Sequence, residues 1–171
     1  MCNPLASRTF LVWLLLPVVS SLASAQGIEK NKYQAIEVKQ FEVGQGTNMP
    51  KHYQRSMMQE IPLALLDIGK FKHVFRAGEA PADANLPLLQ LSGTVTKFTA
   101  GSEVKRFFIV GAGTTSVTAH VRFVDAATQR VLLEDDVDGK VILGGVVASE
   151  SLGATRGLAK EIAKVTKRTF F

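Results

Sequence analysis

Three histidines are the side chains of this sequence best suited to metal binding or acid–base chemistry. His52, His73 and His120 are widely separated, without the H-x-H or H-x-x-x-H spacing that brings two imidazoles to one metal ion. Their surroundings predict a segment before a helix, a short strand and a long strand. The sequence therefore predicts no metal site, and it favours a surface or half-buried position for His120, beside Thr118 and Arg122.

Carboxylates are the second group with catalytic potential, because glycosidases use two of them across one bond. The chain has an acidic run formed by Glu134, Asp135, Asp136 and Asp138. Strand alternation sends Glu134, Asp136 and Asp138 to one face, which is typical of a solvated face or of a sheet edge protected by charge. No G-x-S-x-G serine elbow is present. A hydrolase with carboxylates converging from separate strands stays an alternative.

The segment Gly111-Ala112-Gly113-Thr114-Thr115 is a candidate phosphate cradle, because glycines expose backbone N–H groups to an anion. It lacks the Gly-Lys-Ser or Gly-Lys-Thr ending of a P-loop, and a strand rather than a helix is predicted to follow it. A tight bend or close packing at the start of a strand explains these glycines better. We therefore expect no cofactor.

Small residues recur at four-residue steps near the C-terminus. If a helix reaches back over all of them, they form a ridge that another backbone can approach closely. The other interpretation is a flexible linker over residues 144–153, with only Gly153 and Gly157 in the helix and packed on the sheet. Glycine costs a helix about 1 kcal/mol, so each one needs a packing reason. The candidate interaction surface joins this ridge to the basic end of the last helix: Gly145, Ser149, Gly153, Gly157, Lys160, Lys164, Lys167 and Arg168.

The first 25 residues have the pattern of a secretory signal peptide. They hold 16 apolar residues and one charge, Arg8, and they end in Ala23-Ser24-Ala25, an A-x-A cleavage site. The apolar run is about half the ~20 residues that a membrane-spanning helix needs, and it contains Pro17. We expect cleavage between Ala25 and Gln26, a mature protein without a transmembrane anchor, and a periplasmic or secreted location.

Cleavage would also remove the single cysteine, Cys2, and the single tryptophan, Trp13. The mature chain would then form no disulfide and no thiolate site. Cys2 precedes the apolar run, whereas lipid attachment needs a cysteine just after it, so we expect no lipoprotein. Loss of Arg8 leaves 19 Lys and Arg against 15 Asp and Glu, a mild excess that favours anionic neighbours. No basic run interleaved with aromatic residues indicates a nucleic-acid partner.

The mature chain is long enough for one domain, which we place at residues 35–171 after a flexible arm at residues 26–34. Alternating apolar residues predict strands over 36–43, with an irregularity near Phe41, and over 71–75, 89–96, 117–123 and 131–133. The short connector 125–130 predicts an antiparallel hairpin. Residues 77–87 and 101–115 are expected to be loops.

Two helices are predicted from apolar residues at helical spacing. The first, between His52 and Gly69, contains Pro62, which indicates either one kinked helix or a shorter helix with proline in its first turn. The second contains Leu158, Ile162 and Val165. The expected fold class is α+β, an antiparallel sheet of four to five strands with both helices packed on one face.

Five strings of residues stand out in this domain: Leu91-Ser92-Gly93-Thr94-Val95-Thr96-Lys97-Phe98, Gly101-Ser102, Lys105-Arg106, Val110-Gly111-Ala112-Gly113 and Val121-Arg122-Phe123-Val124-Asp125-Ala126-Ala127-Thr128. Together they resemble the bacterial envelope family known as domain of unknown function 4410. One departure is at the hairpin turn, where the family usually has Thr-Gly and this chain has Thr128 followed by Gln129; the other is the missing lipoprotein cysteine. The resemblance covers residues 35–171 and implies a small secreted module with no established chemistry and no catalytic residue to assign.

From these observations the expected function is an exported, non-catalytic envelope module that binds an envelope protein or an anionic surface. Two alternatives stay open. One is a hydrolase acting on an envelope polymer, and the other is a structural homo-oligomer joined through the C-terminal helix.

Overall fold

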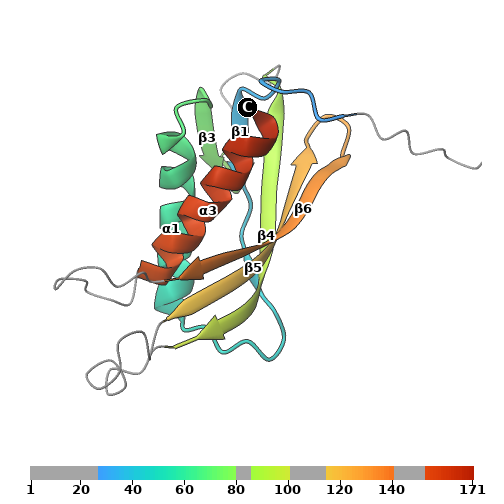
Figure 1. The fold of residues 1–171 in the computed structure, drawn as a ribbon. Helices are drawn as coiled ribbons and strands as arrows, with labels where there is room; N and C mark the ends of the chain where they lie inside the picture. The colour runs from blue at the N-terminus through green and yellow to red at the C-terminus, as the bar shows by residue number, and fades with distance from the viewer. Residues whose placement is uncertain (1–26, 80–85, 101–114, 141–152) are drawn as a thin grey trace, which may run out of the picture.

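The computed structural model describes residues 27–79, 86–100, 115–140 and 153–171 of the 171-residue chain. Within these ranges, two helices lie over one face of a six-stranded sheet, which makes an α+β fold (Figure 1). The elements in chain order are β1 (Ala35–Val38), β2 (Glu42–Val43), α1 (Lys51–Asp67), β3 (His73–Arg76), β4 (Leu88–Thr99), β5 (Ser116–Asp125), β6 (Val131–Lys140) and α3 (Gly153–Phe170).

The sheet is mixed, which corrects the expected purely antiparallel sheet of four to five strands. The strand order is β3-β1-β4-β5-β6, and β2 pairs with β4 beyond the end of β1. β1 pairs in parallel with β3 and β4, and β2 pairs in parallel with β4. The reason is the connection: α1 carries the chain from β1–β2 back to β3, and a helical crossover returns the chain to the end where the first strand began. Only β4–β5 and β5–β6 are antiparallel.

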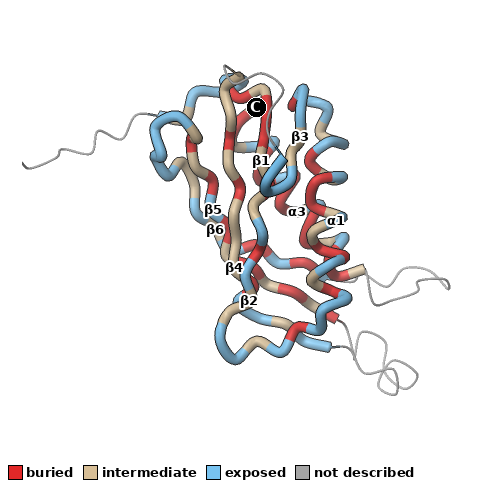
Figure 2. Tube along the Cα trace, turned by 180° about the vertical axis from the view of Figure 1, so that it is seen from behind, coloured by how far each residue is buried: buried red, intermediate tan, exposed pale blue. Residues whose placement is uncertain are grey.

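Both helices bury an apolar face against the same side of the sheet. Met57, Ile61 and Leu65 of α1 are almost fully buried, at the four-residue spacing that the sequence predicts. Leu158 and Ile162 of α3 do the same, and they join one core cluster with the inward residues of the strands (Figure 2). In the described ranges neither helix is long and apolar enough to cross a bilayer.

The structure shows how the chain folds at the two irregular points of the predicted elements, the first strand and Pro62. The first predicted strand is split into β1 and β2, which are separated by residues 39–41. Pro62 lies inside a single helix that runs from Lys51 to Asp67, so the interpretation with a short helix starting at proline is wrong. The third long strand extends through the acidic run to Lys140, and β5 and β6 form the predicted antiparallel hairpin.

Candidate functional site

The two helices run parallel and side by side. The Ser56 and Thr155 hydroxyls hydrogen-bond at 2.9 Å, and one turn further along α1 the Arg156 guanidinium contacts the Glu60 carboxylate at 3.2 Å. Because these contacts advance in the same direction along both helices, the C-terminal turns of α1 lie beside the middle and end of α3. This arrangement lets the outer sides of both helices line a common surface.

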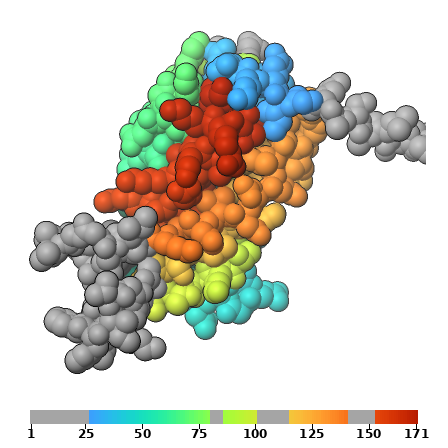
Figure 3. Space-filling model, viewed as in Figure 1, coloured from blue at the N-terminus to red at the C-terminus, as the bar shows by residue number. Residues whose placement is uncertain are grey.

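A groove of about 530 Å³ lies between these turns. Its apolar surface comes from Ala64 and Ile68 of the α1 end and from Ala163 of α3, and Asp67 is its acidic residue. Figure 3 shows α3 crossing the outside of the molecule beside the green residues that include the end of α1. The remaining lining residues all come from α3 and are all basic: Lys160, Lys164, Lys167 and Arg168.

The four basic residues of the predicted interaction surface are therefore gathered at one groove. All four are exposed, and the Lys164 ammonium contacts the Glu161 carboxylate at 3.3 Å. An exposed ion pair of this kind contributes little to stability, which leaves the cations available to an anionic ligand. A groove lined by apolar side chains and by four cations is suited to binding by charge and contact area.

The small residues of the same prediction lie elsewhere. Gly157 faces β6, and a Cβ placed there would stand 2.8 Å from the Lys140 carbonyl oxygen. Gly153 is the first residue of α3. Gly145 and Ser149 lie outside the described residues, as do residues 111–114 of the candidate phosphate cradle; its last residue, Thr115, is buried. Within the described part, then, Gly157 serves the packing of α3 on its own sheet.

Three residues of the acidic run, Glu134, Asp136 and Asp138, lie on the sheet face that the helices leave uncovered. They pair across the hairpin with β5: the Arg122 Nε contacts a Glu134 oxygen at 3.1 Å, and the His120 Nδ1 contacts an Asp136 oxygen at 2.8 Å. Thr118 donates its hydroxyl hydrogen to Asp138 at 2.7 Å. The predicted alternation of this run is confirmed, and these exposed cross-strand pairs have the geometry of a solvated face.

The other two histidines do not meet His120. His52 lies on α1 with its ring against Tyr53, and His73 of β3 stacks on Phe75. Across the described ranges, no three His, Cys, Asp or Glu side chains come together in a way that could hold a metal ion.

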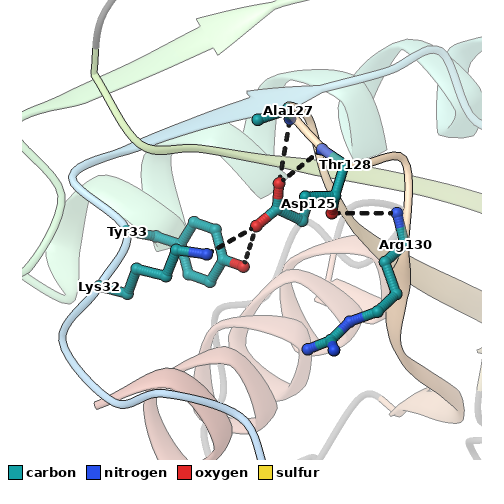
Figure 4. A network of polar contacts seen from close by, with 6 residues as sticks. All are labelled: Lys32, Tyr33, Asp125, Ala127, Thr128 and Arg130. Atoms are coloured by element: carbon teal, nitrogen blue, oxygen red, sulfur yellow. Dashed lines mark hydrogen bonds and ion pairs between the residues drawn. The ribbon is translucent and has the colours of Figure 1, made fainter. Parts of the chain in front are cut away.

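One polar cluster was not predicted from the sequence, and it joins the N-terminal segment to the β5–β6 turn (Figure 4). The Asp125 carboxylate accepts hydrogen bonds from the Lys32 ammonium at 2.9 Å and the Tyr33 hydroxyl at 2.7 Å. Its other oxygen accepts the N–H groups of Ala127 and Thr128, each at 3.0 Å. We call these five residues the Asp125 clasp. An aspartate at the start of a short turn is the signal that could have indicated the turn half.

Part of the segment expected to be a flexible arm is packed on the domain. Tyr33 is 3% exposed and packs edge-on against Phe170 at the end of α3. The N–H of Asn31 donates to the Phe170 carbonyl at 2.7 Å. The N–H of Gln34 donates to the Pro87 carbonyl, and the Gln34 carbonyl accepts the N–H of Lys72. Residues 31–34 are therefore held on the domain by these contacts.

Tyr33 and Asp125 are the two acids of the clasp, and their pKa values are shifted in opposite directions. Burial raises the pKa of Tyr33 well above its ordinary value, and the hydrogen bond to the negative Asp125 adds to this effect. Burial also acts to raise the pKa of Asp125, but the hydrogen bonds from Lys32, Tyr33 and the Thr128 N–H outweigh it and hold that pKa well below the ordinary value. Asp125 is thus a fixed negative charge near neutral pH, which is unsuited to general acid chemistry.

Solved structures of other proteins share this fold. PelC from Paraburkholderia phytofirmans, solved as a dodecamer, has 18% identity and a TM-score of 0.56, covering 85% of this chain and 96% of PelC. The hypothetical protein CT253 from Chlamydia trachomatis has 10% identity and a TM-score of 0.55, covering 80% of this chain and 97% of that protein. A lipoprotein from Neisseria meningitidis, GNA1162, has 15% identity and a TM-score of 0.44, covering 78% of this chain and 95% of its own.

No curated protein matches the sequence of this chain. The family model for the domain of unknown function DUF4410 matches residues 23–154, which include all six strands, α1 and the start of α3. This match covers most of the chain and confirms the resemblance found in the strand motifs. The chain belongs to the DUF4410 family.

Proposed function

We propose that this protein is an exported, non-catalytic module that binds another component of the cell envelope through the groove between α1 and α3. The observation that carries the proposal is the gathering of four exposed cations from α3 at one apolar groove. The secretory pattern of residues 1–25 supports the compartment.

The charge distribution favours an anionic partner. Helices α1 and α3 together carry seven Lys and Arg against three Asp and Glu. β6, at the far edge of the sheet, carries four acidic residues against one lysine. An anionic component is therefore attracted to the helical layer and repelled from the β6 edge, which orients it toward the groove before contact.

The carboxylates of the described residues support a non-catalytic role. Asp125 is buried, but its hydrogen bonds stabilise the charged form, so it holds no proton to donate near neutral pH. Glu134, Asp136 and Asp138 are exposed and paired with β5 side chains. A hydrolase would need one of two facing carboxyls to keep a raised pKa.

Chemical crosslinking in intact cells tests the proposal. Cells express the full chain with a photocrosslinking amino acid in place of Ala163, which lines the groove, and are then irradiated. We expect adducts in the envelope fraction that are lost in Lys164→Glu/Lys167→Glu. The matched control Lys30→Glu/Lys97→Glu changes two exposed lysines outside the helices and should retain the adducts. Equal adducts in both variants, or turnover of an envelope polymer by the purified protein, would reject the proposal.

A second candidate is a homo-oligomer, which PelC favours because that protein of the same fold was solved as a dodecamer. The opposite charges of the helical layer and the β6 edge would suit head-to-tail contacts between copies, which close into a ring when the rotation between neighbours closes. Gly153→Leu should then reduce the mass measured by light scattering while circular dichroism shows a folded monomer. An unchanged mass would reject association through the start of α3.

A further inference from the structure

Two leucines on the outer side of α1 are not explained by the fold. Leu63 and Leu66 are each 54% exposed, although large apolar side chains in this fold are otherwise mostly buried. They are three residues apart, so they lie one turn from each other on the same side of the helix. The buried residues Ile61 and Leu65 use the opposite side of α1, toward the sheet. Burial of Leu63 and Leu66 therefore requires something outside this chain's core.

The exposed leucines lie next to the cationic groove. Ala64 and Asp67, their neighbours along α1, line the groove together with Lys160 and Lys164 of α3. Because α1 and α3 run parallel here, the leucines stand at the same level as the α3 cations. The outer surface of the helical layer thus combines apolar side chains with lysines on long flexible stems. We call Leu63, Leu66, Lys160, Lys164 and Lys167 the outer helical patch.

This combination fits the interface of a membrane. Leucines lower their free energy by entering the boundary between headgroups and acyl chains, and lysines beside them reach phosphate oxygens of the headgroups. Three of the four groove cations are lysines, which act as mobile point charges, whereas a fixed carboxylate on a protein partner is better matched by the planar fork of arginine. A diffuse layer of anionic headgroups is the partner with the matching charge and the matching apolar interior.

We propose that the outer helical patch docks the protein peripherally on a bilayer that contains anionic phospholipid, with Leu63 and Leu66 in the interface and the lysines on the headgroups. The inference rests on the proposed function, whose envelope partner it specifies. Docking on this side leaves the uncovered sheet face, with its Glu134 and Asp136, turned away from the negative membrane surface. The charge separation between the two layers therefore sets the orientation as well as the attraction.

Cosedimentation with lipid vesicles tests this inference. The probe is the processed protein, purified from the periplasm of cells expressing the full chain, mixed with vesicles of phosphatidylglycerol and phosphatidylcholine or of phosphatidylcholine alone. We expect binding only to the anionic vesicles, weakened by salt. Lys160→Gln/Lys164→Gln should weaken it more than tenfold, because each cation near an anionic surface contributes about a fivefold factor. Leu63→Ser/Leu66→Ser should weaken it by a similar factor at unchanged charge.

Matched variants control for net charge and for loss of apolar surface. Lys30→Gln/Lys97→Gln removes two exposed lysines elsewhere, and Val131→Ser removes a 38% exposed valine on β6. Both should bind as wild type does, and circular dichroism should show all variants folded. No binding to anionic vesicles, or binding that is insensitive to the leucine variant, would overturn membrane docking. If vesicle binding fails while crosslinking at Ala163 still depends on the groove lysines, the proposed function stands without membrane docking. If neither vesicle binding nor crosslinking depends on the groove lysines, both proposals fail.

Discussion

At the residue scale, the Tyr33 hydroxyl gives a test of the Asp125 clasp. Tyr33→Phe keeps the ring against Phe170 but removes the donor that lies 2.7 Å from the Asp125 carboxylate. Removing one hydrogen bond to a buried charged group should lower the free energy of unfolding by about 1.5 to 3 kcal/mol. Urea unfolding followed by circular dichroism measures this loss. Tyr53→Phe is the control, and equal losses in both variants would mean that the hydrogen bond contributes nothing.

The hairpin turn gives a second test at the residue scale. Gln129 has a φ of 56°, in the left-handed region where a side chain other than glycine costs about 1 to 2 kcal/mol. Glycine adopts a positive φ without a Cβ clash, so Gln129→Gly should relieve this strain. It also loses the hydrogen bond from the Gln129 side chain to the Ala126 carbonyl and gains unfolded-state entropy. We expect a net gain of about 0.5 kcal/mol, measured as a higher Tm. Gln129→Ala loses the hydrogen bond without the relief and should lower the Tm.

At the element scale, the contact between β6 and α3 depends on two glycines. A Cβ at Gly139 would lie 2.4 Å from both the Ala154 carbonyl oxygen and the Leu158 nitrogen, and a Cβ at Gly157 would lie 2.8 Å from the Lys140 carbonyl oxygen. Backbone atoms cannot move aside cheaply, so Gly139→Ala should cost about 3 kcal/mol or more of unfolding free energy. Gly157→Ala should cost less, because alanine returns about 1 kcal/mol of helix propensity.

Urea unfolding measures both changes, and Gly27→Ala is the control because nothing lies within 4 Å of the added Cβ. The expected order of stability is Gly27→Ala, then Gly157→Ala, then Gly139→Ala. A stabilised Gly157→Ala would show that helix propensity outweighs the close approach between α3 and β6.

The elements themselves could be predicted from periodicity, but the pairing between them could not. Apolar residues at helical spacing gave both helices, and the short connector gave the β5–β6 hairpin. The parallel direction of β1 and β3 was missed, although a helix between two neighbouring strands is its signal. β3 is short and its alternation is weak, so the strand–helix–strand unit did not stand out from a run of antiparallel strands.

For the candidate site, local spacing predicted the cations and missed what depends on distant contacts. The four basic residues of α3 lie within one helix, so their common side follows from the sequence. Their apolar partners Ala64 and Ile68 come from α1, and no local pattern joins the two helices. The same limit explains the Asp125 clasp, because Tyr33 and Asp125 are 92 residues apart. A tyrosine among polar residues near a terminus has the same local pattern whether it is loose or buried.

At the scale of the whole molecule, the Asp125 clasp closes the fold where residues 31–33 meet the C-terminal end of α3. Residues of the N-terminal segment contact both Asp125 at the β5–β6 turn and Phe170 in the last turn of α3 there. The groove lies on the same helix whose end is held in this way. Loosening the clasp should therefore act on the stability of the domain more than on the charge of the groove, which separates structural variants from binding variants in the vesicle and crosslinking experiments.

The pH dependence of stability should report this closure. Because the folded pKa of Asp125 lies below its unfolded value of about 3.9, its contribution is present above that value and is lost as the pH falls through the folded pKa. Tyr33 has a raised pKa, so stability is also lost as the pH rises above about 10, where the unfolded tyrosine ionises first. Asp125→Asn should be about 3 kcal/mol less stable at pH 7, and the difference from wild type should shrink steadily below pH 4 in urea unfolding. Asp138→Asn changes an exposed carboxylate and should follow the wild-type curve; a constant gap between Asp125→Asn and wild type down to pH 2 would mean that the Asp125 charge does not hold the clasp together.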